Sequence, residues 1–133
     1  MALQYSTTVR NAKLDAVETA IGTSAIMRIR SGTAPANCAT ADSGTVLATI
    51  NLPSDWMAAA SGGTKALSGT WQDAAADATG TAAHFRVYDS GGTVCHMQGT
   101  VGTSATDMIV DSTSFTAGQQ FTVTAFTLTA GNA

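Results

Sequence analysis

Residues 83–101, AHFRVYDSGGTVCHMQGTV, decide the fold that the sequence predicts. Apolar and polar residues alternate along both halves, and the run DSGGT between them has the composition of a turn. A period of two indicates a strand with one buried face, and a Gly-rich connection joins two such strands into a β-hairpin. If Asp89 pairs with Thr93, one face carries four apolar side chains, namely those of Phe85, Val87, Cys95 and Met97. The other face carries His84, Arg86, Tyr88, His96 and Gln98.

The chain on both sides of this hairpin continues the same pattern. Four further short segments alternate, at residues 25–30, 46–52, 108–110 and 120–129. The last changes its apolar parity after Ala125, which indicates a β-bulge or a crossing between sheets. Ala and Gly tracts over residues 58–80 predict a flexible surface loop around a short strand at 67–71. Short strands separated by turns predict a mainly β fold, an antiparallel β-sandwich of jelly-roll-like type.

The N-terminal segment has a helical period. Apolar residues recur on one stripe between residues 7 and 21, namely Val9, Ala12, Ala16, Val17, Ala20 and Ile21. Ser6 or Thr7 supplies a capping hydroxyl, and Gly22 is typical of a left-handed helix end. The charged residues between them are expected on the solvent side, namely Arg10, Lys13, Asp15 and Glu18. The sequence thus predicts an N-terminal helical segment over residues 1–22 and a β-sandwich domain over residues 23–133.

Composition limits the classes of partner. Charged residues make up 11% of the chain and apolar residues 44%, with a formal net charge of -3. A soluble monomer usually carries more charge, about 25% of its residues, so the composition favours a homo-oligomer. The six Lys and Arg residues are spread out, which predicts no nucleic-acid partner. The sequence has no run of about 18 apolar residues, which predicts no membrane span.

The sequence offers little for catalysis or metal binding. It has no G-x-S-x-G nucleophile motif and no phosphate-binding loop of the G-x-x-x-x-G-K type. The chain is therefore expected to be non-enzymatic, with no catalytic residue and no cofactor. His84 and His96 could share one face, but two histidines fall short of the three or four ligands of zinc. A metal site would then need completion across a symmetry axis.

The cysteines and the tryptophans carry the remaining expectations. The first ten residues lack the pattern of a signal peptide, so Cys38 and Cys95 are expected to stay thiols inside a cell. A disulfide remains open, because it depends on the distance between them in the fold. Trp56 and Trp71 adjoin loops, where aromatic side chains anchor interfaces, stack on sugars or fill the core. Val9, Val17 and Ile21 are expected to pack the helix on the sandwich or on a neighbouring subunit.

Four stretches of the chain together resemble small structural proteins of tailed-bacteriophage virions. They are LQYSTTVRNAKLDAVETAIGTSAIMRIRSGTAPANC (3–38), LPSDWMAAASGG (52–63), HFRVYDSGGTVCHMQGTVG (84–102) and FTVTAFTLTAGNA (121–133). The resemblance implies a capsid decoration or cement protein that stabilises the head lattice as a closed homo-oligomer, with a trimer favoured. Its partners would be the major capsid protein or other virion proteins, and its place the virion, assembled in the host cytoplasm. The alternatives are a tail, collar or adaptor component and a carbohydrate-binding host-attachment module.

Overall fold

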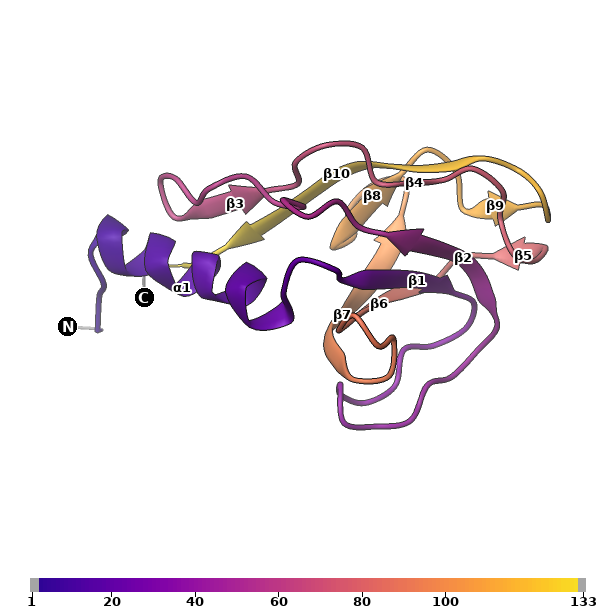
Figure 1. Ribbon diagram of the computed structural model, residues 1–133, viewed down its shortest axis with the longest axis horizontal. Helices are drawn as coiled ribbons and strands as arrows, with labels where there is room; N and C mark the ends of the chain where they lie inside the picture. The colour runs from indigo at the N-terminus through magenta and orange to yellow at the C-terminus, as the bar shows by residue number, and fades with distance from the viewer. Residues whose placement is uncertain (1–2, 132–133) are drawn as a thin grey trace.

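The computed structural model describes residues 3–131, which form one helix and a set of mostly short strands (Figure 1). The elements are α1 (Thr7–Ile21), β1 (Ile26–Arg30), β2 (Val46–Asn51), β3 (Thr64–Ala66), β4 (Gln72–Asp73), β5 (Gly80–Thr81), β6 (His84–Tyr88), β7 (Cys95–Gly102), β8 (Met108–Val110), β9 (Ser114–Phe115) and β10 (Phe121–Thr129). In Figure 1, α1 and β3 lie at one end of an elongated molecule and the two-stranded β5–β9 ribbon at the other. The predicted mainly β fold with one N-terminal helix is confirmed.

Eight of the described strands form one curled, mixed sheet, and β5 and β9 form a separate two-stranded one. The order of the larger sheet is β2-β1-β6-β7-β8-β10-β3, and β4 pairs with β10 beside this path. All pairs are antiparallel except β7 and β8, which run parallel over Val101–Gly102 and Met108–Ile109. The expectation of a purely antiparallel arrangement is therefore wrong. A short loop makes the parallel pair possible, because the Asp107 carboxylate accepts hydrogen bonds from the Thr100 N–H and hydroxyl and closes the loop on itself.

The hairpin that the sequence predicts is confirmed as β6 and β7. The Asp89 N–H donates to the Val94 carbonyl, so the turn is one residue longer than a pairing of Asp89 with Thr93 would make it. The register also shifts between Val87 and Tyr88, which places Cys95 opposite Tyr88. Directly paired residues share a face of the sheet, so Cys95 lies on the polar face and not beside Phe85, as expected from simple alternation.

The helix has its predicted bounds, Thr7–Ile21. The Ser6 hydroxyl accepts a hydrogen bond from the Val9 N–H at 3.3 Å and caps the first turn. Gly22 ends the helix, and its N–H donates to the Glu18 carbonyl at 2.9 Å. Its φ of 96° favours glycine, while its ψ of -177° leads the chain away extended and not into the left-handed helical region.

Trp56 and Trp71 lie in the core, where neither side chain is exposed to solvent. Their rings begin a chain of aromatic contacts through Phe126 to Phe85, with centroid distances of 5.9, 5.6 and 5.5 Å. Each indole N–H is satisfied internally, Trp56 on the Gly22 carbonyl and Trp71 on the Trp56 carbonyl. Contacts outside the domain and a sugar-stacking platform are therefore not open to these two residues in this structure.

The Ala- and Gly-rich stretch over residues 58–80 is more ordered than its composition predicts. β3 pairs with the end of β10, and β4 pairs with the start of β10. The strand expected at 67–71 is absent. The Leu67 N–H donates to the Phe126 carbonyl and the Trp71 carbonyl accepts from the Val123 N–H, and these two separate hydrogen bonds to β10 do not form a ladder. This stretch is ordered despite its many Ala and Gly residues, because its backbone N–H and C=O groups pair with β10 at the edge of the sheet.

Candidate functional site

The helix α1 binds the rest of the molecule through its charged side. Lys65 of β3 is 2% exposed, and its ammonium group donates to Asp15 at 2.7 Å and lies 3.0 Å from the Glu18 carboxylate. The sequence predicts Asp15 and Glu18 on the solvent side of the helix, but both bind Lys65 of the sheet, although the Asp15 side chain remains 48% exposed. We call Lys65, Asp15, Glu18 and the backbone groups bound to them the Lys65 cluster.

Backbone groups of residues 57–63 complete this contact. The Met57 and Ala60 N–H groups donate to Glu18 and Asp15. The Gly63 N–H donates to the Asn11 side chain at 2.9 Å. Buried N–H groups need an acceptor, and these have none in the sheet, so polar side chains of the helix supply it.

The charges of the Lys65 cluster stabilise one another. Burial by itself would lower the pKa of Lys65, but the hydrogen bonds that its ammonium group donates to Asp15 and Glu18 outweigh burial and leave the pKa raised. The hydrogen bond from Lys65, followed by that from the Ala60 N–H, lowers the pKa of Asp15. Lys65 and Asp15 are thus charged at neutral pH. The helix is attached by ion pairs and also by Leu14 and Ile21, which are buried.

The apolar stripe of α1 consequently points away from the sheet at most of its positions. Residues 9, 12, 16 and 20 lie on one side of a helix, opposite residues 11, 14, 15 and 18. The side chains of the first group are all exposed, with Val9 at 41%. We call Val9, Ala12, Ala16 and Ala20 the outward face. Of the residues predicted to pack the helix, Ile21 is buried and Val17 is partly buried against the core, while Val9 faces solvent.

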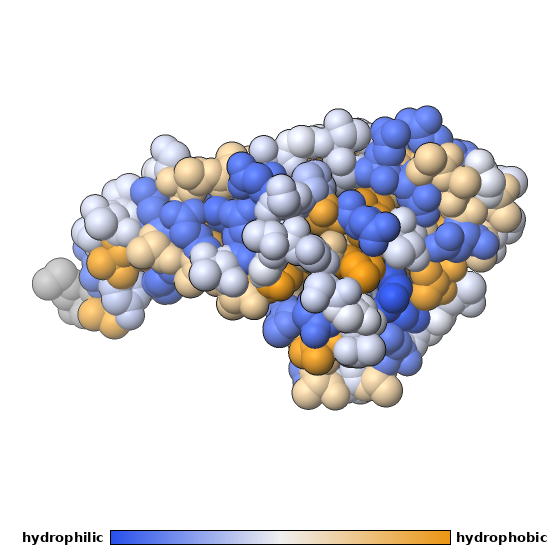
Figure 2. Space-filling view, in the orientation of Figure 1, coloured by the Kyte–Doolittle hydropathy of each residue, from blue (hydrophilic) through white to orange (hydrophobic). Residues whose placement is uncertain are grey.

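A groove runs beside the outward face, in the corner between α1 and the β6–β7 hairpin. It has a volume of about 330 Å³ and is lined by Lys13, Ala16, Val17, Ala20, Ile21 and His96. The space-filling view shows apolar residues scattered along the helix arm and an indented outline below it (Figure 2). His96 thus faces the helix, whereas His84 is buried and its Nδ1 hydrogen-bonds to the Gly32 carbonyl at 2.8 Å. The structure does not bring the two histidines together.

A second groove opens where the sheet splits. β8 pairs with β7 only at Val101–Gly102 and with β10 only between Val123 and Phe126. Beyond these pairs β7 and β10 diverge, and a groove of about 450 Å³ lies between them. Its lining includes Phe85, Met97, Phe126 and Leu128.

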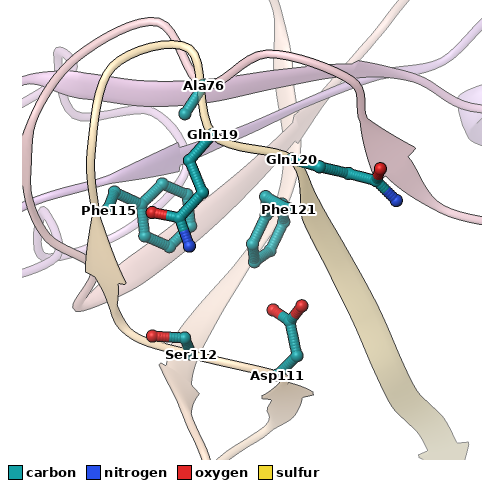
Figure 3. A pocket seen from close by; sticks show the side chains of 7 residues that line it. All are labelled: Ala76, Asp111, Ser112, Phe115, Gln119, Gln120 and Phe121. Atoms are coloured by element: carbon teal, nitrogen blue, oxygen red, sulfur yellow. The ribbon is translucent and has the colours of Figure 1, made fainter.

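The opposite end of the molecule holds a small pocket beside the β5–β9 ribbon (Figure 3). The rings of Phe115 and Phe121 lie 4.6 Å apart there, and Asp111 and Ser112 lie at its edge. The lining side chains leave no room for a water molecule. This pocket is therefore a packed part of the core and does not offer space for a substrate.

A second buried polar group holds the loop over residues 31–45 against the hairpin. One Arg86 nitrogen, Nη2, donates to the carbonyls of Asn37, Cys38 and Thr40 at 3.0–3.1 Å. Its other donors reach Asp42 and Gln98. Arg30 and the Tyr88 hydroxyl also donate to Asp42, at 3.0 and 2.7 Å. We call Arg86, Arg30, Tyr88 and the partners of Arg86 the Arg86 cluster. Burial by itself would raise the pKa of Asp42, but hydrogen bonds from Tyr88 and Arg86 outweigh it and leave the pKa lowered.

Neither the outward face nor the Arg86 cluster is evident from sequence pattern. The stripe of α1 is visible, but the side on which it packs depends on Lys65, far away in the chain. Within residues 3–131, no group of three or more His, Cys, Asp or Glu side chains could hold a metal ion. The only helix described there is neither long nor apolar enough to cross a membrane.

The outward face and its groove are thus the candidate functional site. Their chemistry is that of a contact surface, with small apolar side chains, one lysine and one histidine. Comparison with known proteins does not extend this description, since no family model, curated protein or solved structure matches the chain.

Proposed function

We propose that this protein is a non-enzymatic structural subunit of a tailed-bacteriophage virion. In this proposal it is a capsid decoration or cement protein that binds the head lattice as a homo-oligomer, with a trimer favoured. Its partners are the major capsid protein or other virion proteins, and it assembles in the host cytoplasm. The resemblance of the four sequence stretches supplies the class of protein, and the outward face of α1 supplies the contact surface.

The observation that carries the proposal is the orientation of α1. A helix on a small soluble domain normally buries its apolar stripe and exposes its charges. Here Asp15 and Glu18 bind Lys65, and four residues of the stripe, those of the outward face, are left in water. Exposed apolar surface on a helix is a common docking element, since its burial against a partner is favourable at about 25 cal/mol per Å².

The alternative of a carbohydrate-binding module relied on Trp56 and Trp71 as sugar-stacking residues. Sugar platforms need exposed aromatic rings, and both Trp56 and Trp71 are fully buried. A tail, collar or adaptor role uses the same kind of contact surface, and location in the particle separates it from decoration.

The test measures oligomer mass by light scattering and then sedimentation with undecorated capsids. The variant Ala16→Glu places a charge in the middle of the outward face without touching the Lys65 cluster. Thr103→Glu adds the same charge on an exposed loop far along β7 and serves as the matched control. A point substitution is sharper than removal of the helix, because removal would leave Lys65 buried without its carboxylates.

The expected result is a closed oligomer that sediments with capsids for the wild type and for Thr103→Glu. Ala16→Glu should fold normally, judged by circular dichroism, and lose at least tenfold in association, equal to about 1.4 kcal/mol. A folded Ala16→Glu protein that associates like the wild type would contradict the role of the outward face. A monomeric wild-type protein that ignores capsids would contradict decoration itself.

A further inference from the structure

The two cysteines meet where the 31–45 loop crosses the β6–β7 hairpin. The Cys38 carbonyl accepts a hydrogen bond from Arg86 Nη2 at 3.1 Å. Cys95 lies opposite Tyr88, on the same face of the hairpin as Arg86. The two side chains interact directly, both are partly buried, and both are free thiols in this structure. Two residues far apart in the chain thus bring their side chains into contact.

The loop is fixed by contacts that do not involve sulfur. Arg86 donates hydrogen bonds to three backbone carbonyls of the loop, those of Asn37, Cys38 and Thr40. The Gln98 side chain donates to the Pro35 carbonyl at 2.7 Å, and the Tyr88 hydroxyl donates to Asp42 at 2.7 Å. These bonds hold Cys38 against Cys95 before any covalent link forms, which gives the pair a high effective concentration.

We propose that Cys38 and Cys95 form an intramolecular disulfide when the protein meets a small disulfide oxidant such as oxidised glutathione. The Cys38 thiolate attacks one sulfur of the oxidant, releases one glutathione thiolate and leaves a mixed disulfide on Cys38. The Cys95 thiolate then attacks Cys38 Sγ and releases the second glutathione thiolate. Two protein thiols are oxidised, one glutathione disulfide is reduced, and the two protons pass through solvent to the released thiolates.

The order of the two steps follows from the surroundings of Cys95. Burial, followed by the contact with Cys38, raises the pKa of the Cys95 thiol to about 11. Cys95 is therefore protonated at neutral pH and is a poor first nucleophile, because the thiolate is the reactive form. The closing step is slow at neutral pH and becomes faster as the pH rises.

The link would fasten the 31–45 loop to the hairpin, and it does not depend on the proposed function. The Arg86 cluster already orders the loop in the reduced protein. The covalent link removes conformations from the unfolded chain, so it stabilises the fold without changing the folded contacts. Reduction in a cytosol and oxidation outside it would then give two forms with one structure and different stability.

The test equilibrates the purified full-length protein with reduced and oxidised glutathione at pH 8, followed by acid quenching and intact-mass measurement. The wild type should lose the mass of two hydrogens and both titratable thiols, and peptide mapping should recover a Cys38–Cys95 linked pair. Its melting temperature should rise by about 5 °C or more on oxidation. Cys95→Ser should stop at a glutathione adduct on Cys38.

The matched control moves one thiol by a single residue, in Cys38→Ser combined with Ala39→Cys. Adjacent loop residues point in different directions, so its equilibrium constant for disulfide formation should fall at least about tenfold. Circular dichroism checks that the control folds, and Cys95→Ser serves in its place if it does not. A wild type that keeps both thiols, ends as a stable glutathione adduct or cross-links between molecules would overturn the proposal. The proposal would also be overturned if the folded control formed its disulfide with the same equilibrium constant as the wild type.

Discussion

The Lys65 cluster and the Arg86 cluster perform the same task with different chemistry. Each places buried cations of the sheet against a segment that covers them. Lys65 faces α1, whereas Arg86 and Arg30 face the 31–45 loop. Lys65 binds two carboxylates and the Ala58 carbonyl. Arg86 binds one carboxylate, one side-chain amide and three backbone carbonyls. The helix is therefore held mainly by charge, and the loop mainly by hydrogen-bond geometry.

The difference follows from what each segment offers. A helix satisfies its own carbonyls, so only its side chains are available to a partner. A loop without ladder partners exposes carbonyls, which suit the five fixed donors of a guanidinium. The two clusters should therefore respond differently to substitution and to pH.

The largest effect is expected from Arg86→Lys. An ammonium group keeps the charge but cannot reach the three loop carbonyls and Gln98 together, so several buried acceptors lose their donor. The free energy of unfolding should fall by about 3 kcal/mol, measured by urea denaturation. A loss below about 1 kcal/mol would mean that charge, and not donor geometry, holds the loop.

A smaller loss is expected from Lys65→Met. The substitution removes the buried cation, but the Asp15 and Glu18 side chains are 48% and 21% exposed and can be hydrated once the pairs are broken. The free energy of unfolding should fall by about 2 kcal/mol, less than for a pair buried on both sides. Adding Asp15→Asn and Glu18→Gln should recover part of the loss. No recovery in the triple variant would contradict an attachment by charge.

The smallest effect on stability is expected when the pH is lowered, and it should affect one cluster before the other. The pKa values of Asp15 and Asp42 are both lowered from 3.8 by folding. Their contributions to stability are therefore complete above that value and are lost as the pH falls through the lower folded pKa. The helix should loosen first, because Lys65 then keeps Glu18 and one carbonyl, whereas Arg86 keeps three carbonyls and Gln98.

Amide hydrogen exchange between pH 5 and pH 2 checks this order. The Ala60 N–H, which donates to Asp15, should lose protection before the groups of the 31–45 loop. Asp42→Asn supplies the comparison, since it removes the titrating group from the Arg86 cluster alone. Simultaneous loss of protection in both segments would mean that the two clusters do not differ in kind.

Local pattern in the sequence was sufficient for the elements and insufficient for their contacts. The hairpin and the helix from residue 7 to 21 follow from periodicity and turn composition. The change of parity expected after Ala125 lies next to a register shift between Val123 and Ala125 in the pairing of β10 with β8. The side of α1 that packs could not be predicted, because its partner Lys65 lies in an Ala- and Gly-rich stretch without a pattern. Trp56 and Trp71 adjoin loops in sequence but face the core, since each finds a backbone carbonyl for its indole N–H.

The order of the strands has a consequence for the rate of folding. β6 and β7 are neighbours in the chain and can pair within about 1–10 μs. β1 pairs with β6 through Met27 and Val87, and β3 pairs with β10 through Lys65 and Leu128, so both pairings close long loops before they gain any contact energy. The hairpin should therefore form early, while the docking of β1 on β6 limits the rate. Substitutions in that pairing would slow folding, whereas those in α1 would mainly speed unfolding.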